Sequence, residues 1–250
     1  MTELIFLGTA AAVPDIDHHN THLALRNRAG VVLIDCGSSP LIRLEEAGIA
    51  IEEVSDIILT HFHPDHVGSL PLLLMNMWLM GRQQALRIYG LHHCLKRVED
   101  VMGFYKWEDW PQFFPVAFHR LPEREHVLAL EQEGLKVFAS PVRHVIPTIG
   151  LRLEIEASKT VAYSCDTAPC PEVVRLAEGA QILIHEATGE EVGHSSPRQA
   201  GEIAAEAGVE VVYLVHYPVI GVSKKQLLTE AGETFTGNVL VAEDLDRLTL

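Results

Sequence analysis

Basic residues, cysteines and long apolar runs are all scarce in this sequence. It holds 19 lysines and arginines against 34 acidic residues, a formal net charge of −15, so a broad basic face for nucleic acid is not expected. No stretch approaches the roughly 20 apolar residues of a membrane span. The longest candidate, 70–80, is interrupted by Pro71 and Asn76. We therefore expect no membrane association.

The N-terminus and the cysteines indicate a reducing compartment. The opening M-T-E-L-I-F-L-G lacks the basic start of a secretory signal. The four cysteines show no C-x-x-C spacing: Cys36, Cys94, Cys165 and Cys170. A cytoplasmic protein with free thiols is the prediction.

No Pro/Gly/Ser-rich linker and no low-complexity tract divides the chain, so we expect one domain over residues 1–250. Two runs of strands, each followed by helices, predict two β-sheets packed face to face with helices outside. Apolar, β-branched runs predict strands at 4–7, 23–25, 31–34, 57–60, 86–89, 116–119, 127–130, 135–140, 149–155, 160–163, 182–184, 211–215, 239–242 and 247–250. Helices are expected at 41–47, 70–80, 91–102, 171–178, 197–207 and 224–231.

The stretch T-H-F-H-P-D-H-V-G, residues 60–68, concentrates three histidines and an aspartate between a buried strand and a helix. In α/β sheets, functional sites collect at such carboxyl ends of strands. Side chains alternate along an extended chain, so His61 and His63 point to one side. Pro64 keeps the residue before it extended. Two imidazoles therefore converge on one point.

The next two residues of the same stretch, Asp65 and His66, can reach a second point nearby. Imidazole suits zinc, and a carboxylate suits zinc, manganese or iron. The alternative is a solvated histidine-rich loop. The H-x-H-x-D-H spacing between a buried strand and a helix favours metal binding instead.

This spacing resembles the signature of the metallo-β-lactamase superfamily of dinuclear metal hydrolases. The resemblance implies an αββα four-layer sandwich of two mixed β-sheets with helices outside. It also requires a further His, a bridging Asp and a final His, each at a strand end. Residues that follow predicted strands match these positions: His144, Asp166 and His216.

By this resemblance, one metal has the ligands His61, His63 and His144, and the other has Asp65, His66 and His216. Asp166 would bridge the two metals. Asp35 resembles the family's aspartate that orients ligands without binding metal. The implied cofactors are two divalent metal ions, zinc first, with manganese or iron as alternatives.

Two later segments resemble loops of ribonuclease Z, the tRNA 3′-processing branch: I-H-E-A-T at 184–188 and G-H-S-S at 193–196. The segments F-L-G-T at 6–9 and L-I-D-C-G at 33–37 also resemble that branch. The resemblance puts Glu186 and His194 beside the metals, with His194 contacting the phosphate or protonating the leaving oxygen. The alternative for His194 is an exposed residue ahead of a helix cap. His185 follows a buried strand and is expected to pack or hydrogen-bond as a supporting residue.

The chain departs from ribonuclease Z in one respect. That family carries a long Gly/Pro-rich arm that clamps tRNA between the third His motif and the bridging Asp. Here only two strands and the turn at 156–159 separate His144 from Asp166. Together with the negative charge, the missing arm favours a small-molecule or phosphodiester substrate over RNA.

The leading hypothesis is a phosphodiesterase of the ribonuclease Z-like type, acting on small or single-stranded substrates through a metal-bridging hydroxide, with Asp65, His194 and Glu186 as catalytic residues. One alternative is a tRNA 3′-processing endonuclease in which a partner subunit replaces the arm. Others are a lactone or carboxylic-ester hydrolase and a non-enzymatic metal or redox module.

The segment 103–115 is rich in aromatic residues. Its rings pack on the domain, or they form a lid or a subunit contact. We expect a homodimer.

Overall fold

The computed structural model describes residues 2–156 and 159–250, so the predicted turn at 156–159 lies partly outside the described residues. Seven strands form the first mixed sheet, in the spatial order β14 (Arg247–Thr249), β1 (Glu3–Gly8), β2 (His22–Asn27), β3 (Gly30–Ile34), β4 (Val54–Ile58), β5 (Leu86–Leu91) and β6 (Val116–Leu121). Seven more form the second, in the order β13 (Asn238–Val241), β12 (Val211–Val215), β11 (Ile182–Glu186), β10 (Lys159–Tyr163), β9 (Thr148–Ile155), β8 (Leu135–Val142) and β7 (Val127–Gln132).

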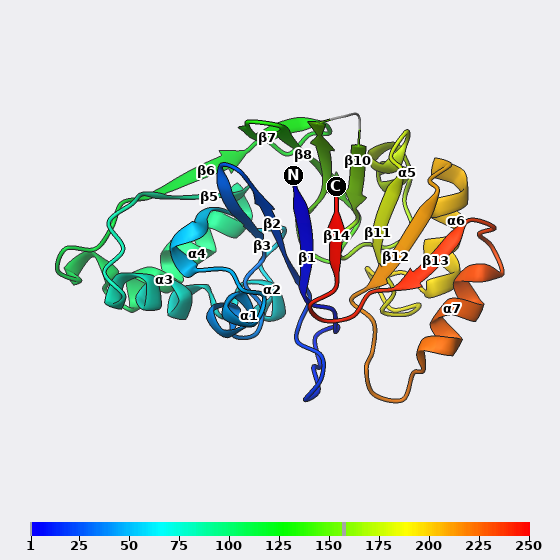
Figure 1. The fold of residues 1–250 in the computed structure, drawn as a ribbon, viewed down its shortest axis with the longest axis horizontal. Coiled ribbons are helices and arrows are strands. Elements are labelled where there is room, and N and C mark those ends of the chain that lie inside the picture. Colours follow the sequence, from blue (N-terminus) through cyan, green and yellow to red (C-terminus); the bar gives the residue numbers. More distant parts are fainter. Residues whose placement is uncertain (1, 157–158) are drawn as a thin grey trace.

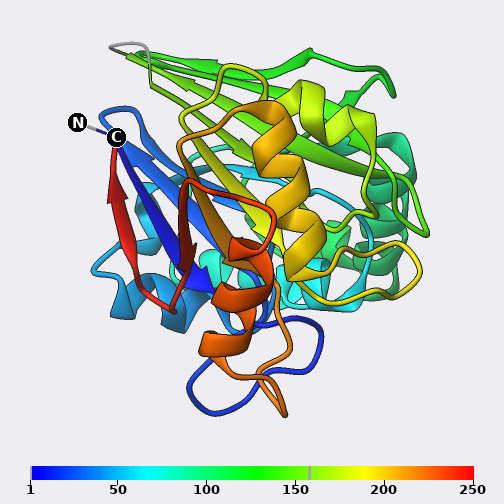
Figure 2. The same cartoon turned by 90° about the vertical axis from the view of Figure 1, so that its right-hand side faces the viewer.

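Helices cover the outer face of each sheet (Figures 1 and 2). On the first sheet lie α1 (Pro40–Glu46), α2 (Pro64–Val67), α3 (Leu70–Leu79) and α4 (His92–Phe104), with short 3-10 turns η1 (Ile51–Glu53) and η2 (Trp107–Asp109). On the second lie α5 (Pro171–Ala177), α6 (Pro197–Ala207) and α7 (Lys224–Gly232). The predicted αββα four-layer sandwich is confirmed.

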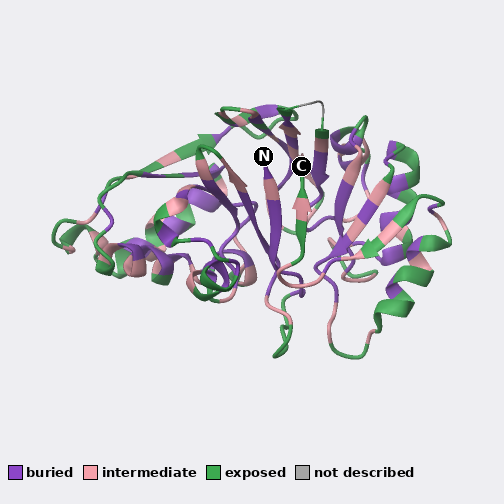
Figure 3. Ribbon diagram, in the orientation of Figure 1, coloured by how far each residue is buried: buried purple, intermediate pink, exposed green. Residues whose placement is uncertain are grey.

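The alternation of side chains along β1 shows how one strand serves two cores. Leu4 and Phe6 belong to the apolar cluster between the sheets, whereas Ile5 and Leu7 belong to the cluster beneath the helices of the first sheet. A third cluster lies between the second sheet and its helices. Both faces of the central strands are therefore buried (Figure 3), which is why they read as continuous apolar runs.

The strand expected at 57–60 ends at Ile58, because the Thr60 N–H is donated to the Asp35 carboxylate at 2.8 Å instead of to a neighbouring strand. The last two strands do not pair with each other. β13 pairs in parallel with β12, and β14 pairs antiparallel with β1 in the other sheet, so the end of the chain crosses between the sheets.

The aromatic segment 103–115 packs mainly on the first sheet's outer layer. Trp78 of α3 stacks on Trp110 with ring centroids 5.0 Å apart, and its indole N–H donates to the Pro111 carbonyl at 2.9 Å. Phe114 is buried, but Phe104 is 86% exposed. Within the described ranges, no helix has the length and apolar character needed to cross a bilayer. All four cysteines are buried and free.

Candidate metal centre

The seven predicted ligands follow the carboxyl ends of four strands, β4 in the first sheet and β8, β10 and β12 in the second. The edges of the two sheets therefore meet at one site, as the family resemblance implied. His63 has extended backbone angles, φ −102° and ψ 152°, which agrees with the restriction that the following proline imposes. Residues 64–67 then form the single turn α2, which precedes the helix α3.

Three histidines form the first group of donor atoms. His61 Nε2 lies 3.0 Å from His63 Nδ1, and His144 Nε2 lies 3.2 Å from the same atom. The alternation argument for His61 and His63 therefore holds. His144, 81 positions away from His63, completes the group.

The second group contains Asp65, His66 and His216. Asp65 Oδ2 lies 3.5 Å from His66 Nε2 and 3.4 Å from His216 Nε2. These atoms satisfy the distance expected of ligands that share one small cation. The chain thus brings two distinct groups of donors to one site.

Asp166 lies between the two groups. Its Oδ2 atom is 3.7 Å from His61 Nε2, 3.4 Å from His66 Nε2 and 3.5 Å from His216 Nε2. Burial alone would raise the pKa of this carboxyl, but the neighbouring imidazoles of His216 and His66 hold it well below its usual range. Asp166 is therefore an ionised carboxylate that lies between the two groups of donors.

The pKa shifts of three of the histidines fit metal ligation. Burial lowers the pKa of His61, His63 and His144, which favours the neutral imidazole that a metal binds. For His66, burial opposes the charged form, yet Asp166 and Asp35 raise its pKa well above the usual value. The two carboxylates therefore favour a positive charge beside them, supplied either by a protonated His66 or by a bound cation.

Two atoms of the centre are buried without a hydrogen-bond partner: His66 Nε2 and Asp166 Oδ1. Such orphaned polar atoms cost free energy in a protein interior unless they bind something. Imidazole and carboxylate donors in this number are suited to zinc, manganese or iron. The donors that the chain supplies thus fit a divalent metal.

Hydrogen bonds from the opposite ring nitrogen orient three of the histidines. His66 Nδ1 donates to Asp35 at 2.8 Å, and His144 Nδ1 donates to the Gly193 carbonyl at 2.7 Å. The Thr188 hydroxyl donates to the His216 carbonyl, so it accepts from His216 Nδ1, both at 2.9 Å. Each contact places the proton on Nδ1 and leaves an Nε2 lone pair facing the other donors.

Sequence reasoning identified Asp35 but missed the roles of Thr188 and Gly193. Thr188 lies within the H-E-A-T segment, which was the available signal. The Gly193 contact is made by a backbone carbonyl, which no residue pattern reveals. Positive φ angles at Asp35 (64°), Cys165 (54°) and His216 (49°) mark local backbone strain around the centre.

Glu186 and His194 form a pair at the edge of the centre. The Glu186 carboxylate is fully buried and accepts from His194 Nδ1 at 2.9 Å and from the Thr167 and Thr188 N–H groups at 2.9 and 3.0 Å. Its oxygens are thereby engaged, so it positions His194. Burial lowers the pKa of His194, but the Glu186 contact outweighs this and raises it.

His194 groups with Asp166 and His216 and is partly buried, which contradicts its alternative reading as an exposed residue before a helix cap. Ser196 is the N-cap of α6. His185 is buried and donates from Nδ1 to the Glu186 carbonyl at 2.7 Å, as expected for a supporting residue.

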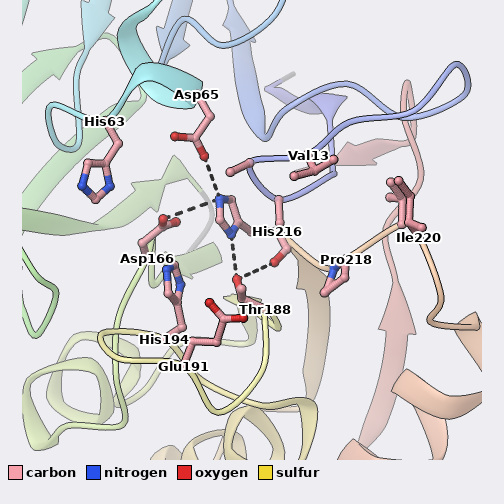
Figure 4. Close-up of a pocket in the computed structure, with 13 residues that line it drawn as sticks. Val13, His63, Asp65, Asp166, Thr188, Glu191, His194, His216, Pro218 and Ile220 are labelled. Atoms are coloured by element: carbon pink, nitrogen blue, oxygen red, sulfur yellow. Dashed lines mark hydrogen bonds and ion pairs between the residues drawn. The ribbon is translucent and has the colours of Figure 1, made fainter.

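A cavity of about 580 Å³ opens beside this centre (Figure 4). Its lining comprises Ala11, Ala12, Val13, His63, Asp65, Asp166, Thr188, Glu191, His194, His216, Pro218, Val219 and Ile220. The structure describes every residue of the aromatic segment 103–115, and none of them lines this cavity. The lid interpretation of that segment is therefore wrong, because its rings pack on the outer layer instead.

Comparisons with known proteins agree with this geometry. Residues 31–217 match the family model for the β-lactamase superfamily domain. Ribonuclease Z of Methanothermobacter thermautotrophicus is 32% identical over 98% of this chain and 95% of its own length. Ribonuclease Z of Mycobacterium sp. strain KMS is 30% identical over 99% and 96%.

Among solved structures, the metallo-β-lactamase fold protein YhfI of Bacillus subtilis superposes with a TM-score of 0.82 at 23% identity, covering 99% of this chain and 98% of that one. The short form of human tRNase Z gives 0.80 at 23% identity with the same coverage. The alignment with the Methanothermobacter protein spans 294 positions although this chain has 250 residues. Part of that relative therefore has no counterpart here.

Proposed function

This chain belongs to the metallo-β-lactamase superfamily and to its ribonuclease Z-like branch, which makes it a metal-dependent hydrolase, and from that premise we propose a dinuclear phosphodiesterase acting on small or single-stranded substrates. One observation carries the proposal. Asp166 Oδ2 lies 3.4–3.7 Å from donors of both histidine-containing groups. A carboxylate in this position could serve as a ligand to both cations.

The proposed ligands of one cation are His61, His63 and His144, and those of the other are Asp65, His66 and His216. Asp166 serves both. We propose zinc, with manganese and iron compatible with the same donors. A cation pair bound there would polarise the phosphoryl oxygens and lower the pKa of a water molecule.

The chain's own residues would then orient the reactants and move the proton. The Asp65 carboxylate accepts a hydrogen bond from the attacking water. His194 uses Nδ1 to contact Glu186, which leaves Nε2 to donate a proton to the leaving oxygen. Glu186 favours the protonated form of His194 because it raises that group's pKa.

Parallel assays of the metal-loaded protein test this proposal. The substrates are bis-p-nitrophenyl phosphate, a homoserine lactone and a precursor tRNA. We expect hydrolysis of the phosphodiester that is lost after chelation and restored by zinc. Hydrolysis of the lactone alone would contradict the proposal and favour the ester-hydrolase alternative.

A tRNA 3′ endonuclease is the second candidate, favoured by the relatives named ribonuclease Z. Against it stand the net charge of −15 and the cavity, in whose described lining no lysine or arginine occurs. Phosphate contacts from basic side chains dominate affinity for RNA and DNA backbones. Cleavage of the precursor tRNA at a rate above that of the small diester would favour this candidate.

We also propose a homodimer. Phe104 and Tyr105 leave large apolar rings exposed at the end of α4, and such surfaces often become subunit contacts. Light scattering of the purified protein tests this, and a monomer at micromolar concentration would contradict it.

A further inference from the structure

We infer that the substrate is a phosphodiester with a single phosphate charge and an apolar ester group, and that this group lies against one wall of the site cavity. The inference rests on the proposed function and names its substrate class. We define the apolar wall as residues 11–13 and 218–220, all of which line the cavity. Figure 4 shows Val13, Pro218 and Ile220 on the side of the cavity away from His63.

The apolar wall joins two segments far apart in the sequence. The Ala11 N–H donates to the Tyr217 carbonyl at 3.0 Å, and Ala10 forms a bridge with Tyr217. The Tyr217 hydroxyl in turn donates to the Ala242 carbonyl at 2.7 Å. These bonds connect both halves of the wall to the frame of the protein.

A buried ion pair holds the segment 9–19, which contains the first half of the wall. Asp244 accepts from the Thr9 hydroxyl at 2.7 Å and from the His19 N–H at 2.8 Å. It also pairs with the buried Arg43 of α1 at 3.0 Å. Both halves of the apolar wall are therefore anchored at their bases, at Ala11 and at Tyr217, which reduces the conformational freedom that binding must restrict.

Two side chains of the wall are open to solvent. Val13 is 64% exposed and Ile220 is 68% exposed. An alkyl or aryl group lying against them would remove apolar area from water. The cavity, about 580 Å³, falls in the size range of sites for small ligands.

Charge limits the other end of the substrate. The described cavity lining contains three carboxylates, Asp65, Asp166 and Glu191, and no lysine or arginine. Two of these carboxylates belong to the proposed metal ligands. Glu191 stands apart from the ligands and repels a second phosphate, so a substrate with one phosphate charge is favoured.

A series of p-nitrophenyl alkyl phosphates tests the inference on the metal-loaded protein. The leaving group stays constant while the second ester group lengthens from methyl to butyl. We expect kcat/KM to rise about threefold per methylene. The p-nitrophenyl ester of thymidine 5′-phosphate, whose second group is polar, should react more slowly than the butyl ester.

Variants connect this preference to the wall. Val13→Ser and Ile220→Ser replace exposed side chains and should each reduce the butyl-to-methyl ratio of kcat/KM about threefold or more. Ile16→Ser, on the same loop but outside the cavity lining, and Val192→Ser are matched controls. Glu191→Gln should raise the relative rate for a dinucleotide that carries an additional terminal phosphate.

Binding measurements separate this inference from the proposed function. Calorimetry with dimethyl and dibutyl phosphate on the metal-loaded protein should give an affinity at least tenfold higher for the dibutyl ester, reduced by Ile220→Ser. Equal affinities, or a ratio that Val13→Ser and Ile220→Ser leave unchanged, would overturn the inference. Tighter dibutyl binding without hydrolysis of any p-nitrophenyl diester would overturn the proposed function and leave the apolar wall's recognition role standing.

Discussion

Asp35 and His66 form a fully buried hydrogen bond of 2.8 Å between a carboxylate and a ring nitrogen. The same Asp35 oxygen accepts from the Thr60 hydroxyl at 2.7 Å, and that hydroxyl lies 3.1 Å from His61 Nδ1. One carboxylate therefore orients His66 directly and His61 through Thr60. These two histidines belong to different groups of donors, so Asp35 aligns both halves of the proposed centre.

Replacement of Asp35 by Asn should weaken metal binding at both positions. Asn tolerates the positive φ of 64°, but it brings a less basic acceptor to the histidines. We expect metal affinity to fall about 10–100-fold, measured by competition with a chelator. Asp15→Asn, at an exposed carboxylate away from the centre, serves as the control. Unchanged affinity in Asp35→Asn would show that the orienting contact is dispensable.

Asp166→Ala should remove metal and activity together, because the proposed bridge contacts both cations. Elemental analysis after dialysis would report the metal content, alongside the rate with bis-p-nitrophenyl phosphate. We expect less than one equivalent of metal and no measurable turnover. If the variant retains two equivalents, the bridging assignment is wrong.

His194→Ala should lower kcat about 10²–10⁴-fold, the range for loss of a general acid, while metal content stays at the wild-type level. Both kcat and metal content are measured on the same preparation of each protein. A diester with a very good leaving group should be affected less, because its departing oxygen needs no proton. Equal loss for good and poor leaving groups would argue against proton donation by His194.

Glu186→Gln should shift the pH dependence of kcat/KM. Glu186 raises the pKa of His194, so removing its charge lowers that pKa. A required acid then loses its proton at lower pH, and the alkaline limb of the profile moves to lower pH. Glu190→Gln, at a nearby exposed carboxylate, is the matched control. An alkaline limb that stays in place would separate Glu186 from the titration of His194.

The buried His22 should make folding stability depend on pH. Burial lowers its pKa to about 4, compared with about 6.5 in an unfolded chain. Between these values the unfolded state binds more protons, so the free energy of unfolding falls as pH drops, by about 3 kcal/mol in total.

The His22→Gln variant tests this dependence by urea unfolding at pH 7.5 and 4.5. Its stability should fall less on acidification than that of the wild type, at equal zinc concentration. His92→Gln, at an exposed histidine, provides the comparison. Parallel losses in all three proteins would assign the acid sensitivity to other groups.

Much of the architecture and the donor set followed from the sequence, because the signals are local. The alternation of His61 and His63 and the proline after them fix the geometry of the motif within a few residues. The strands on both sides of the sandwich were recognisable as apolar runs. The assignment of His144, Asp166 and His216 came from the family resemblance, and the structure groups these side chains with the residues of the motif.

Other features depend on contacts between distant segments and left no local pattern. The apolar wall forms only because residue 11 meets residue 217 across the site. The Gly193 carbonyl accepts from His144 Nδ1, and because every residue has a backbone carbonyl, no sequence pattern indicates this contact. The separation of β13 from β14 is likewise set by tertiary pairing.

The proposed ligands come from both sheets. The residues from His61 to His66 follow β4 of the first sheet, while His144, Asp166 and His216 follow strands of the second. Cations held there would join the two sheets at one edge, in addition to the apolar packing between the sheets and the hydrogen bond from the Ile149 N–H to the Thr60 carbonyl at 3.1 Å. Removal of the metal by chelation would thus weaken the interface between the two sheets more than the packing within either sheet. The proposed metal centre would then also stabilise the fold.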